Sequence, residues 1–113
     1  MKYAVLVYET EQDFADREKH MPAYSAYSQA LIEAGVAAGG AALHPSHTAT
    51  TLRLRDGQRF VQDGPYADTK EQLGGFFIID VTDLDAALDW ASRCPAASHC
   101  AVEVRPLLPM NQD

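Results

Sequence analysis

Long apolar segments and paired cysteines are both missing from this chain of 113 residues. The apolar run at the N-terminus covers only residues 3–8, which is too short for the core of a signal peptide or for a membrane span. Cys94 and Cys100 are the only cysteines, they form no CxxC motif, and we expect two reduced thiols that are buried or partly buried. These absences predict a cytoplasmic protein without membrane contact.

Basic residues are also few, because 9 Lys and Arg stand against 16 Asp and Glu, for a net charge of −7. This balance argues against nucleic acid as a partner, since nucleic-acid binding relies on a basic patch. The one basic stretch, "TLRLRDGQR", is expected to point Arg53, Arg55 and Arg59 to solvent from two strands. The motifs GxGxxG, GxxxxGK[ST], HExxH and GxSxG do not occur, so no cofactor is predicted.

The four histidines do not indicate a metal site by their spacing. His44 and His47 stand three residues apart in "LHPSHTAT", and such a pair can hold a metal or relay a proton. No carboxylate lies near them in sequence, which favours an exposed loop. His20 is expected to be exposed and His99 to lie at the edge of the last strand, and two cysteines with His99 make too few zinc ligands. No metal is predicted.

The chain does contain enough apolar residues, 47%, for the core of one domain over residues 1–113. "KYAVLVY" predicts a first strand. Residues 9–20 are charged and aperiodic, which predicts a loop or a short irregular helix. A helix follows, with Pro22 in its first turn, Tyr24, Tyr27 and Leu31 at helical spacing, and its end at Gly35 or at Gly39–Gly40.

The second half predicts four more elements. Asp56–Gly57 is a strong hairpin signal between "TATTLRLR" and "QRFVQD". "GGFFIIDV" predicts a central strand that is covered on both faces. "TDLDAALDWASRCP" predicts a helix that Thr82 or Asp83 caps and Pro95 ends. In "HCAVEVRPL", Cys100, Val102 and Val104 alternate with Ala101, Glu103 and Arg105, which predicts the last strand.

The order strand, helix, hairpin, strand, helix, strand predicts an α+β fold. We interpret it as a ferredoxin-like sandwich, with a central antiparallel sheet and two helices on one face. Two helices cover only one face of such a sheet, and a second copy of the chain is an economical cover for the other. The sequence therefore predicts a homodimer that packs sheet to sheet.

The stretch "DGPYADTKEQLGG" joins turn chemistry to the central strand. Gly64–Pro65 predicts a turn, and Asp63 can accept backbone N–H groups in it. Asp68 or Thr69 can cap one helical turn, with Glu71 or Gln72 closing a capping box before Gly74–Gly75 ends it. Spacing alone favours a solvated, well-capped loop. The alternative is the rim of a ligand pocket, in which Asp63 is a general base or anchor and Lys70 neutralises an anion.

The stretch "DGPYADTKEQLGGFFIIDVTDLDAALDWASRCP" resembles the DGPF-domain branch of the YCII-related family, with Tyr66 where the motif usually has Phe. "MKYAVLVYE", "MPAYSAYSQALIEAGVAAGG" and "TATTLRLRDG" are also similar to that family. The resemblance implies a ferredoxin-like homodimer of the dimeric α/β-barrel type. The wider family includes a dehydrochlorinase and has a His–Asp pair as its reactive feature. Asp63 is the match for the aspartate, no histidine matches, and Ala41 and Ala42 stand where the branch commonly has an acidic residue.

Three hypotheses of function follow from the residues and the resemblance together. The first is a pocket near the DGPY turn for a small polar or anionic metabolite, with lyase or isomerase chemistry. Its catalytic residue is Asp63, and its ligand-binding residues are Lys70, Glu71, Gly64, Gly74, Gly75 and His44. The second is a non-catalytic regulatory protein linked to extracytoplasmic-function sigma factors, which the gene neighbourhood of the family implies. The third is a purely structural role for the motif, so the sequence leaves open whether the protein is an enzyme.

Overall fold

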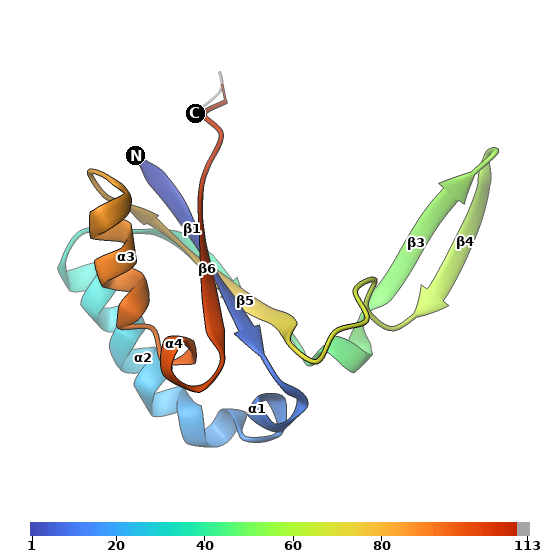
Figure 1. Cartoon of the computed structure of the whole chain (residues 1–113), viewed down its shortest axis with the longest axis horizontal. Coiled ribbons are helices and arrows are strands. Elements are labelled where there is room, and N and C mark those ends of the chain that lie inside the picture. Colours follow the sequence, from blue (N-terminus) through green and yellow to red (C-terminus); the bar gives the residue numbers. More distant parts are fainter. Residues whose placement is uncertain (111–113) are drawn as a thin grey trace.

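A computed structural model, which describes residues 1–110, places a four-stranded antiparallel sheet at the centre of the molecule (Figure 1). The order across the sheet is β2-β5-β1-β6. Its strands are β1 (Lys2–Glu9), β2 (Ala37–Ala42), β5 (Gln72–Asp80) and β6 (Ala101–Pro106). With a helix after the first strand and another before the last, this is the predicted ferredoxin-like α+β fold.

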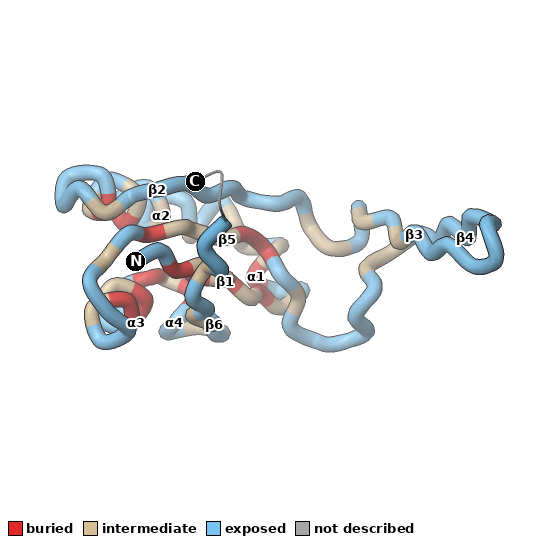
Figure 2. Tube along the Cα trace, turned by 90° about the horizontal axis from the view of Figure 1, so that it is seen from above, coloured by how far each residue is buried: buried red, intermediate tan, exposed pale blue. Residues whose placement is uncertain are grey.

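The core lies on one face of this sheet. Alternate residues of β1, Tyr3, Val5 and Val7, are buried, and β1 pairs with β5 so that Ile79 joins the same layer. Tyr27 and Leu31 of α2 (Arg17–Glu33) and Ala87 and Ala91 of α3 (Leu84–Ser92) complete the cluster. Figure 2 shows the buried segments gathered between these strands and helices. The prediction of two helices on one face is confirmed.

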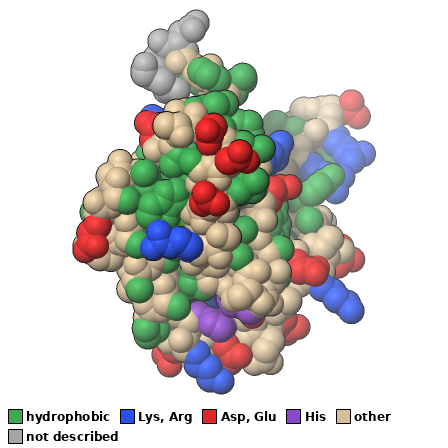
Figure 3. All heavy atoms as spheres, turned by 60° about the vertical axis from the view of Figure 1, so that its left-hand side comes forward, with side chains coloured by type: hydrophobic (Ala, Val, Ile, Leu, Met, Phe, Trp, Pro, Cys, Tyr) green, Lys and Arg blue, Asp and Glu red, His purple; other side chains and the backbone are tan. Residues whose placement is uncertain are grey.

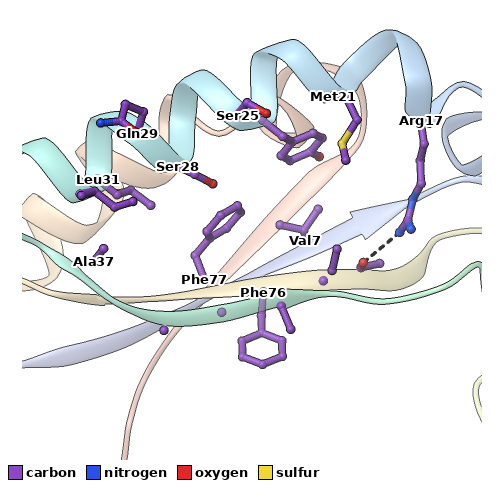
Figure 4. A pocket seen from close by; sticks show the side chains of 18 of the residues that line it. Val7, Arg17, Met21, Ser25, Ser28, Gln29, Leu31, Ala37, Phe76 and Phe77 are labelled. Carbon is purple, nitrogen blue, oxygen red and sulfur yellow. Dashed lines mark hydrogen bonds between the residues drawn. The ribbon is translucent and has the colours of Figure 1, made fainter.

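The opposite face of the sheet carries a second apolar set. Leu6 pairs with Phe76 and Ala4 with Ile78 on that side, and all four residues are only half-buried. Figure 4 shows Phe77 pointing toward α2 and Phe76 pointing away from it. The prediction that this strand is central is confirmed, but within the described part of the chain the buried helix residues pack on one face only.

The first helical region differs from its prediction. α1 (Glu11–Ala15) begins at a capping box, in which Thr10 and Asp13 exchange side-chain and backbone hydrogen bonds. α2 then begins at Arg17, so Pro22 lies inside the helix and not in its first turn. A proline there removes one helical hydrogen bond, and the buried contacts of Tyr27 and Leu31 offset that loss. The charged segment before residue 20 is therefore mostly helical, and it is divided between α1 and the start of α2.

The strand β2 was not predicted, and it takes the place that the sequence assigned to the hairpin. Its residues, "AAGGAA", carry no pattern of burial, because every one is exposed. A side chain at Gly40 would place its Cβ 2.6 Å from the carbonyl oxygen of Phe76, so the close pairing with β5 requires glycine. The segment is a strand because it pairs with β5, and its own sequence pattern does not indicate one.

The predicted hairpin exists, but as a separate two-stranded arm that extends away from the sheet (Figure 1). It comprises β3 (Thr50–Arg55) and β4 (Gln58–Asp63), after a short 3₁₀ helix, η1 (Ser46–Thr48). Asp56 and Gly57 have φ angles of 51° and 77°, which is the geometry of a type I′ turn. Four large apolar residues of the arm are exposed: Leu52, Leu54, Phe60 and Val61. The three arginines of the arm are exposed as predicted.

The C-terminal elements follow their predictions more closely. The Asp83 side chain accepts the backbone N–H of Ala86 and caps α3, and the alternation of β6 matches its burial. Pro95 leads into α4 (Ala96–His99), a short helix that was not predicted. Cys94 is buried and Cys100 half-buried, both as free thiols, as expected.

The longest helix of the described chain is α2, which mixes charged, polar and apolar residues. None of the helices in residues 1–110 is long and apolar enough to cross a membrane.

Candidate functional site

A cavity of about 680 Å³ lies between α2 and the strands β2 and β5. In Figure 4, Met21 and Ser28 of α2 face Val7 and Phe77 of the sheet across this space. Most of its walls are apolar, and the polar groups are contributed by α2 and by one end of the cavity. A space of this size and character suits a small organic ligand with few polar groups.

A buried ion pair closes one end of the cavity. Nη2 of Arg17 donates to Oε1 of Glu9 at 3.0 Å and to the carbonyl oxygen of Gly74 at 2.9 Å, and Nη1 donates to the carbonyl oxygen of Leu43. The Glu9 side chain is only 6% exposed. The guanidinium therefore neutralises a buried carboxylate and ties the first residue of α2 to the ends of three strands.

The adjacent glycines Gly74 and Gly75 line the same cavity, and each has a different reason to lack a side chain. A Cβ on Gly74 would lie 2.0 Å from Oε1 of Glu9. A Cβ on Gly75 would lie 2.8 Å from the carbonyl oxygen of Ala41 in β2. Both glycines lie within β5. Gly74 leaves space for the carboxylate of Glu9, and Gly75 leaves space for the backbone of β2.

Tyr24 contributes the one buried hydroxyl of the cavity that has no hydrogen-bond partner among residues 1–110. Burial raises the pKa of Tyr24 well above its ordinary value, and the charges of Cys94 and Glu9 raise it further. The hydroxyl therefore stays protonated at neutral pH and can donate. The hydroxyl of Tyr27, by contrast, donates to the carbonyl oxygen of Trp90 at 2.9 Å.

A second cavity, of about 720 Å³, lies beside the DGPY turn at the base of the arm. His44, Tyr66 and Leu73 line it. His44, which the sequence predicts to bind a ligand, lines this second cavity. Gly74 and Gly75, which carry the same prediction, line the first cavity. The sequence-predicted residues thus divide between two places.

The remaining predicted residues line neither cavity in the described chain. Asp63 ends β4 and is exposed, and its carboxylate has no hydrogen bond or ion pair with residues 1–110. Lys70 and Glu71 are also exposed. Gly64 has a φ of 103°, and its N–H donates to the carbonyl oxygen of Ala49 at 2.7 Å, so it shapes the turn. Roles for Asp63, Lys70 and Glu71 in binding stay predictions.

The capped helical turn predicted at residues 68–73 is not present, and a different device holds this segment. The side chain of Gln72 donates to the carbonyl oxygens of Ala67 and Thr69 at 2.7 and 2.8 Å. The hydroxyl of Thr69 donates to the carbonyl oxygen of Glu71. These side-chain hydrogen bonds to backbone carbonyl oxygens hold the segment as a bent loop instead of a helical turn.

Sequence reasoning missed Glu9, Arg17 and Tyr24. Glu9 had a signal, because it continues the buried alternation of Tyr3, Val5 and Val7 with a charged residue. Arg17 had none, since the segment around it had no clear period. Tyr24 was correctly placed on the helix, but its spacing does not tell a cavity wall from core.

The structure also brings together a polar group that the sequence did not predict, formed by Asp13, His20 and His99. Asp13 is buried, and its Oδ1 lies 3.1 Å from Nδ1 of His99. The rings of His20 and His99 stack with their centroids 4.4 Å apart. Figure 3 shows histidine side chains reaching the surface together. His20 and His99 are half-buried in this group, so the expectation of an exposed His20 is wrong, and His99 ends α4 rather than opening the last strand.

A comparison with models of protein families identifies the family of this chain. A model of the YCII-related domain matches residues 1–111. A protein of Rhizobium meliloti (strain 1021), described as uncharacterized, is 43% identical over 114 residues, which cover 95% of this chain and 92% of that protein.

A solved structure shares the fold at low sequence identity. It is 5-chloro-2-hydroxyhydroquinone dehydrochlorinase from Burkholderia phenoliruptrix AC1100 in complex with 2,5-dihydroxybenzoquinone. The TM-score is 0.61 at 16% identity, over 100% of this chain and 99% of that one. At this identity the likeness establishes the shared architecture.

Proposed function

Because the chain belongs to the YCII-related family, we propose that it binds a small molecule, with an apolar body and a polar or anionic end, in the cavity beneath α2. We further propose proton-transfer chemistry of the lyase or isomerase type at the end that Glu9 and Arg17 close. The dehydrochlorinase of similar fold lends support, since loss of HCl is an elimination. The DGPY stretch supports membership of the DGPF branch.

The observation that carries this proposal is the unpartnered hydroxyl of Tyr24. A buried hydroxyl without a partner costs about 1–3 kcal/mol. Such a group in a cavity wall is explained when a ligand supplies the missing hydrogen bond. Because burial raises the pKa of Tyr24, the group would meet that ligand as a donor, which suits an anionic or carbonyl oxygen.

Glu9 is the proposed proton acceptor. It is the carboxylate that lines the cavity, and Arg17 orients it through a hydrogen bond of 3.0 Å. An elimination or isomerisation needs one group that removes a proton from carbon and one that supports the developing oxyanion. In this proposal Glu9 performs the first role and Tyr24 the second.

Paired tyrosine variants test the binding. The probe is 2,5-dihydroxybenzoquinone, the compound bound in the structure of similar fold, titrated by calorimetry. Tyr24→Phe should weaken binding at least about tenfold, the equivalent of about 1.4 kcal/mol. Tyr27→Phe is the matched control, because its hydroxyl bonds to the backbone of Trp90 outside the cavity. Equal affinities for both variants would remove the support for this site.

We also propose that the working form is a homodimer in which the apolar sheet face of one copy covers that of the other. Leu6, Phe76 and Ile78 form the centre of this face, and an isolated domain would leave it in water. The arm adds exposed Leu54 and Phe60, at 69% and 52%. A two-stranded hairpin is marginal on its own, so packing against a second copy would stabilise it.

Light scattering after size exclusion tests the dimer. Leu6→Glu should convert it to monomer, because it places a charge at the centre of the proposed interface. Leu84→Glu, on α3 and already 49% exposed, should leave the mass unchanged. A wild-type protein that is monomeric at micromolar concentration would refute the assembly.

The exposed apolar surface of the arm also favours a second function, a regulatory protein that binds another protein. The resemblance to the DGPF branch points to an extracytoplasmic-function sigma factor as this partner. In that case a double variant Leu54→Ser/Phe60→Ser would abolish co-purification of the sigma factor from the native host. Co-purification that survives the double variant, or no sigma factor at all, would count against this function.

A further inference from the structure

The group formed by Asp13, His20 and His99 joins three helical segments that are distant in sequence. Asp13 lies in α1, His20 in α2 and His99 at the end of α4. One ligand atom from each, a carboxylate oxygen and two ring nitrogens, lies within 4.8 Å of both others. None of the three is among the described residues that line the two cavities, so the group is separate from the proposed binding site.

Asp13 is held in place by contacts that leave one oxygen free. The backbone N–H of Thr10 donates to Oδ2 at 2.9 Å, and Oδ1 is directed at His99. The carboxylate is therefore anchored, as metal-binding carboxylates are.

His99 has unused hydrogen-bonding capacity in a shielded place. Both of its ring nitrogens are buried, and neither has a hydrogen-bond partner within residues 1–110. The contact of Nδ1 with Oδ1 of Asp13 at 3.1 Å is an ion-pair distance without hydrogen-bond alignment. Buried imidazoles with idle nitrogens are uncommon, because at least one nitrogen is normally bonded or coordinated.

We propose that Asp13, His20 and His99 bind one divalent transition-metal ion of the zinc class. Two imidazoles and one carboxylate suit zinc and its neighbours, whereas magnesium and calcium prefer ligand sets made of oxygen. Three protein ligands leave at least one position for water or another ligand.

One imidazole ring must turn before the three ligand atoms can close around an ion. Tetrahedral bonds of about 2.0–2.1 Å place the ligand atoms roughly 3.3 Å apart. Asp13 and His99 already meet that separation at 3.1 Å. The rings of His20 and His99 are parallel within 13°, so their lone pairs converge only after one ring turns. His20 is half-buried, in the early part of α2, and is the ring that turns in this proposal.

Zinc titration of chelator-treated protein tests the site. We expect one Zn²⁺ per chain by competition with a chromophoric chelator, and His20→Ala should weaken it at least about tenfold. The control is His44→Ala/His47→Ala, which removes the two histidines between β2 and β3 and should leave the affinity unchanged. Equal affinity in His20→Ala and wild type, or no binding at micromolar zinc, would overturn the proposal.

Two measurements on the unaltered protein cover the case in which His20→Ala fails to fold. Nitrogen-15 spectra of the histidine rings should shift for His20 and His99, but not for His44 and His47, when zinc is added. Cobalt substitution should give visible bands without a thiolate charge-transfer band. Such a band would assign the ion to half-buried Cys100 and overturn this ligand set.

Discussion

Replacing Gly74 by alanine should lower the free energy of unfolding, because the new side chain would collide with a buried carboxylate. The added Cβ would lie 2.0 Å from Oε1 and 2.7 Å from Cδ of Glu9. Glu9 must then move away from Arg17, its ion-pair partner at 3.0 Å. Its side chain is only 6% exposed, so the displaced carboxylate stays largely out of water.

The size of this effect follows from the burial of the two partners. Breaking a buried ion pair costs about 3–5 kcal/mol when one charge is left behind without its partner. The Arg17 side chain is 28% exposed, so water replaces part of its lost contact. We therefore expect a loss of about 3 kcal/mol, at the low end of that range. For a chain of this length it lowers the Tm by roughly 12 °C.

Urea unfolding followed by circular dichroism measures the loss, and a second background isolates its cause. In Glu9→Ala the colliding atoms are absent, so Gly74→Ala should then cost less than about 1 kcal/mol. The same cost in both backgrounds would show that the collision with Glu9 is not the cause. An unchanged wild-type stability would refute the reasoning altogether.

Three further predictions follow from groups near this site. Gly75→Ala places a Cβ 2.8 Å from the carbonyl oxygen of Ala41, so it should cost about 1–3 kcal/mol and speed amide exchange in β2; unchanged exchange would contradict it. Because the pKa of Asp13 is lowered on folding, its stabilisation is complete above the unfolded pKa and lost as pH falls through the folded pKa. The gap in urea midpoint between wild type and Asp13→Asn should therefore shrink between about pH 6 and pH 2; a constant gap would argue against it. Burial raises the pKa of Cys94 to about 11, so the native protein should react with a thiol reagent far more slowly at that position than the unfolded protein, as peptide mapping of the labelled cysteines would show.

The parts of the fold that local chemistry determines were predictable. The positive φ angles of Asp56 and Gly57 need residues that tolerate them, and the cap at Asp83 uses a side chain suited to that role. The strand β2 was not predictable in this way, since its alanines and glycines bury nothing. It forms because β5 offers a free edge, which is a property of the assembled sheet.

The candidate site was harder to predict for the same reason. Glu9, Arg17 and Tyr24 lie on different turns and elements, and only the packing of α2 across the sheet brings them to one cavity. Asp13 and His99 come from nearly opposite ends of the chain. Spacing along a sequence reports neighbours on one helix or strand, whereas these groups are neighbours across elements.

The arm leaves the sheet and returns to it at adjoining places. Ala42 pairs with Gly75, and the N–H of Leu43 donates to the carbonyl oxygen of Gly74 at 2.9 Å. A tight turn would join β2 to β5 equally well. Closing an excursion of about 30 residues instead costs roughly 2 kcal/mol more in chain entropy. Natural selection can therefore lengthen, shorten or change this excursion without disturbing the core, and relatives that share the sheet are free to differ in the length and sequence of their arms.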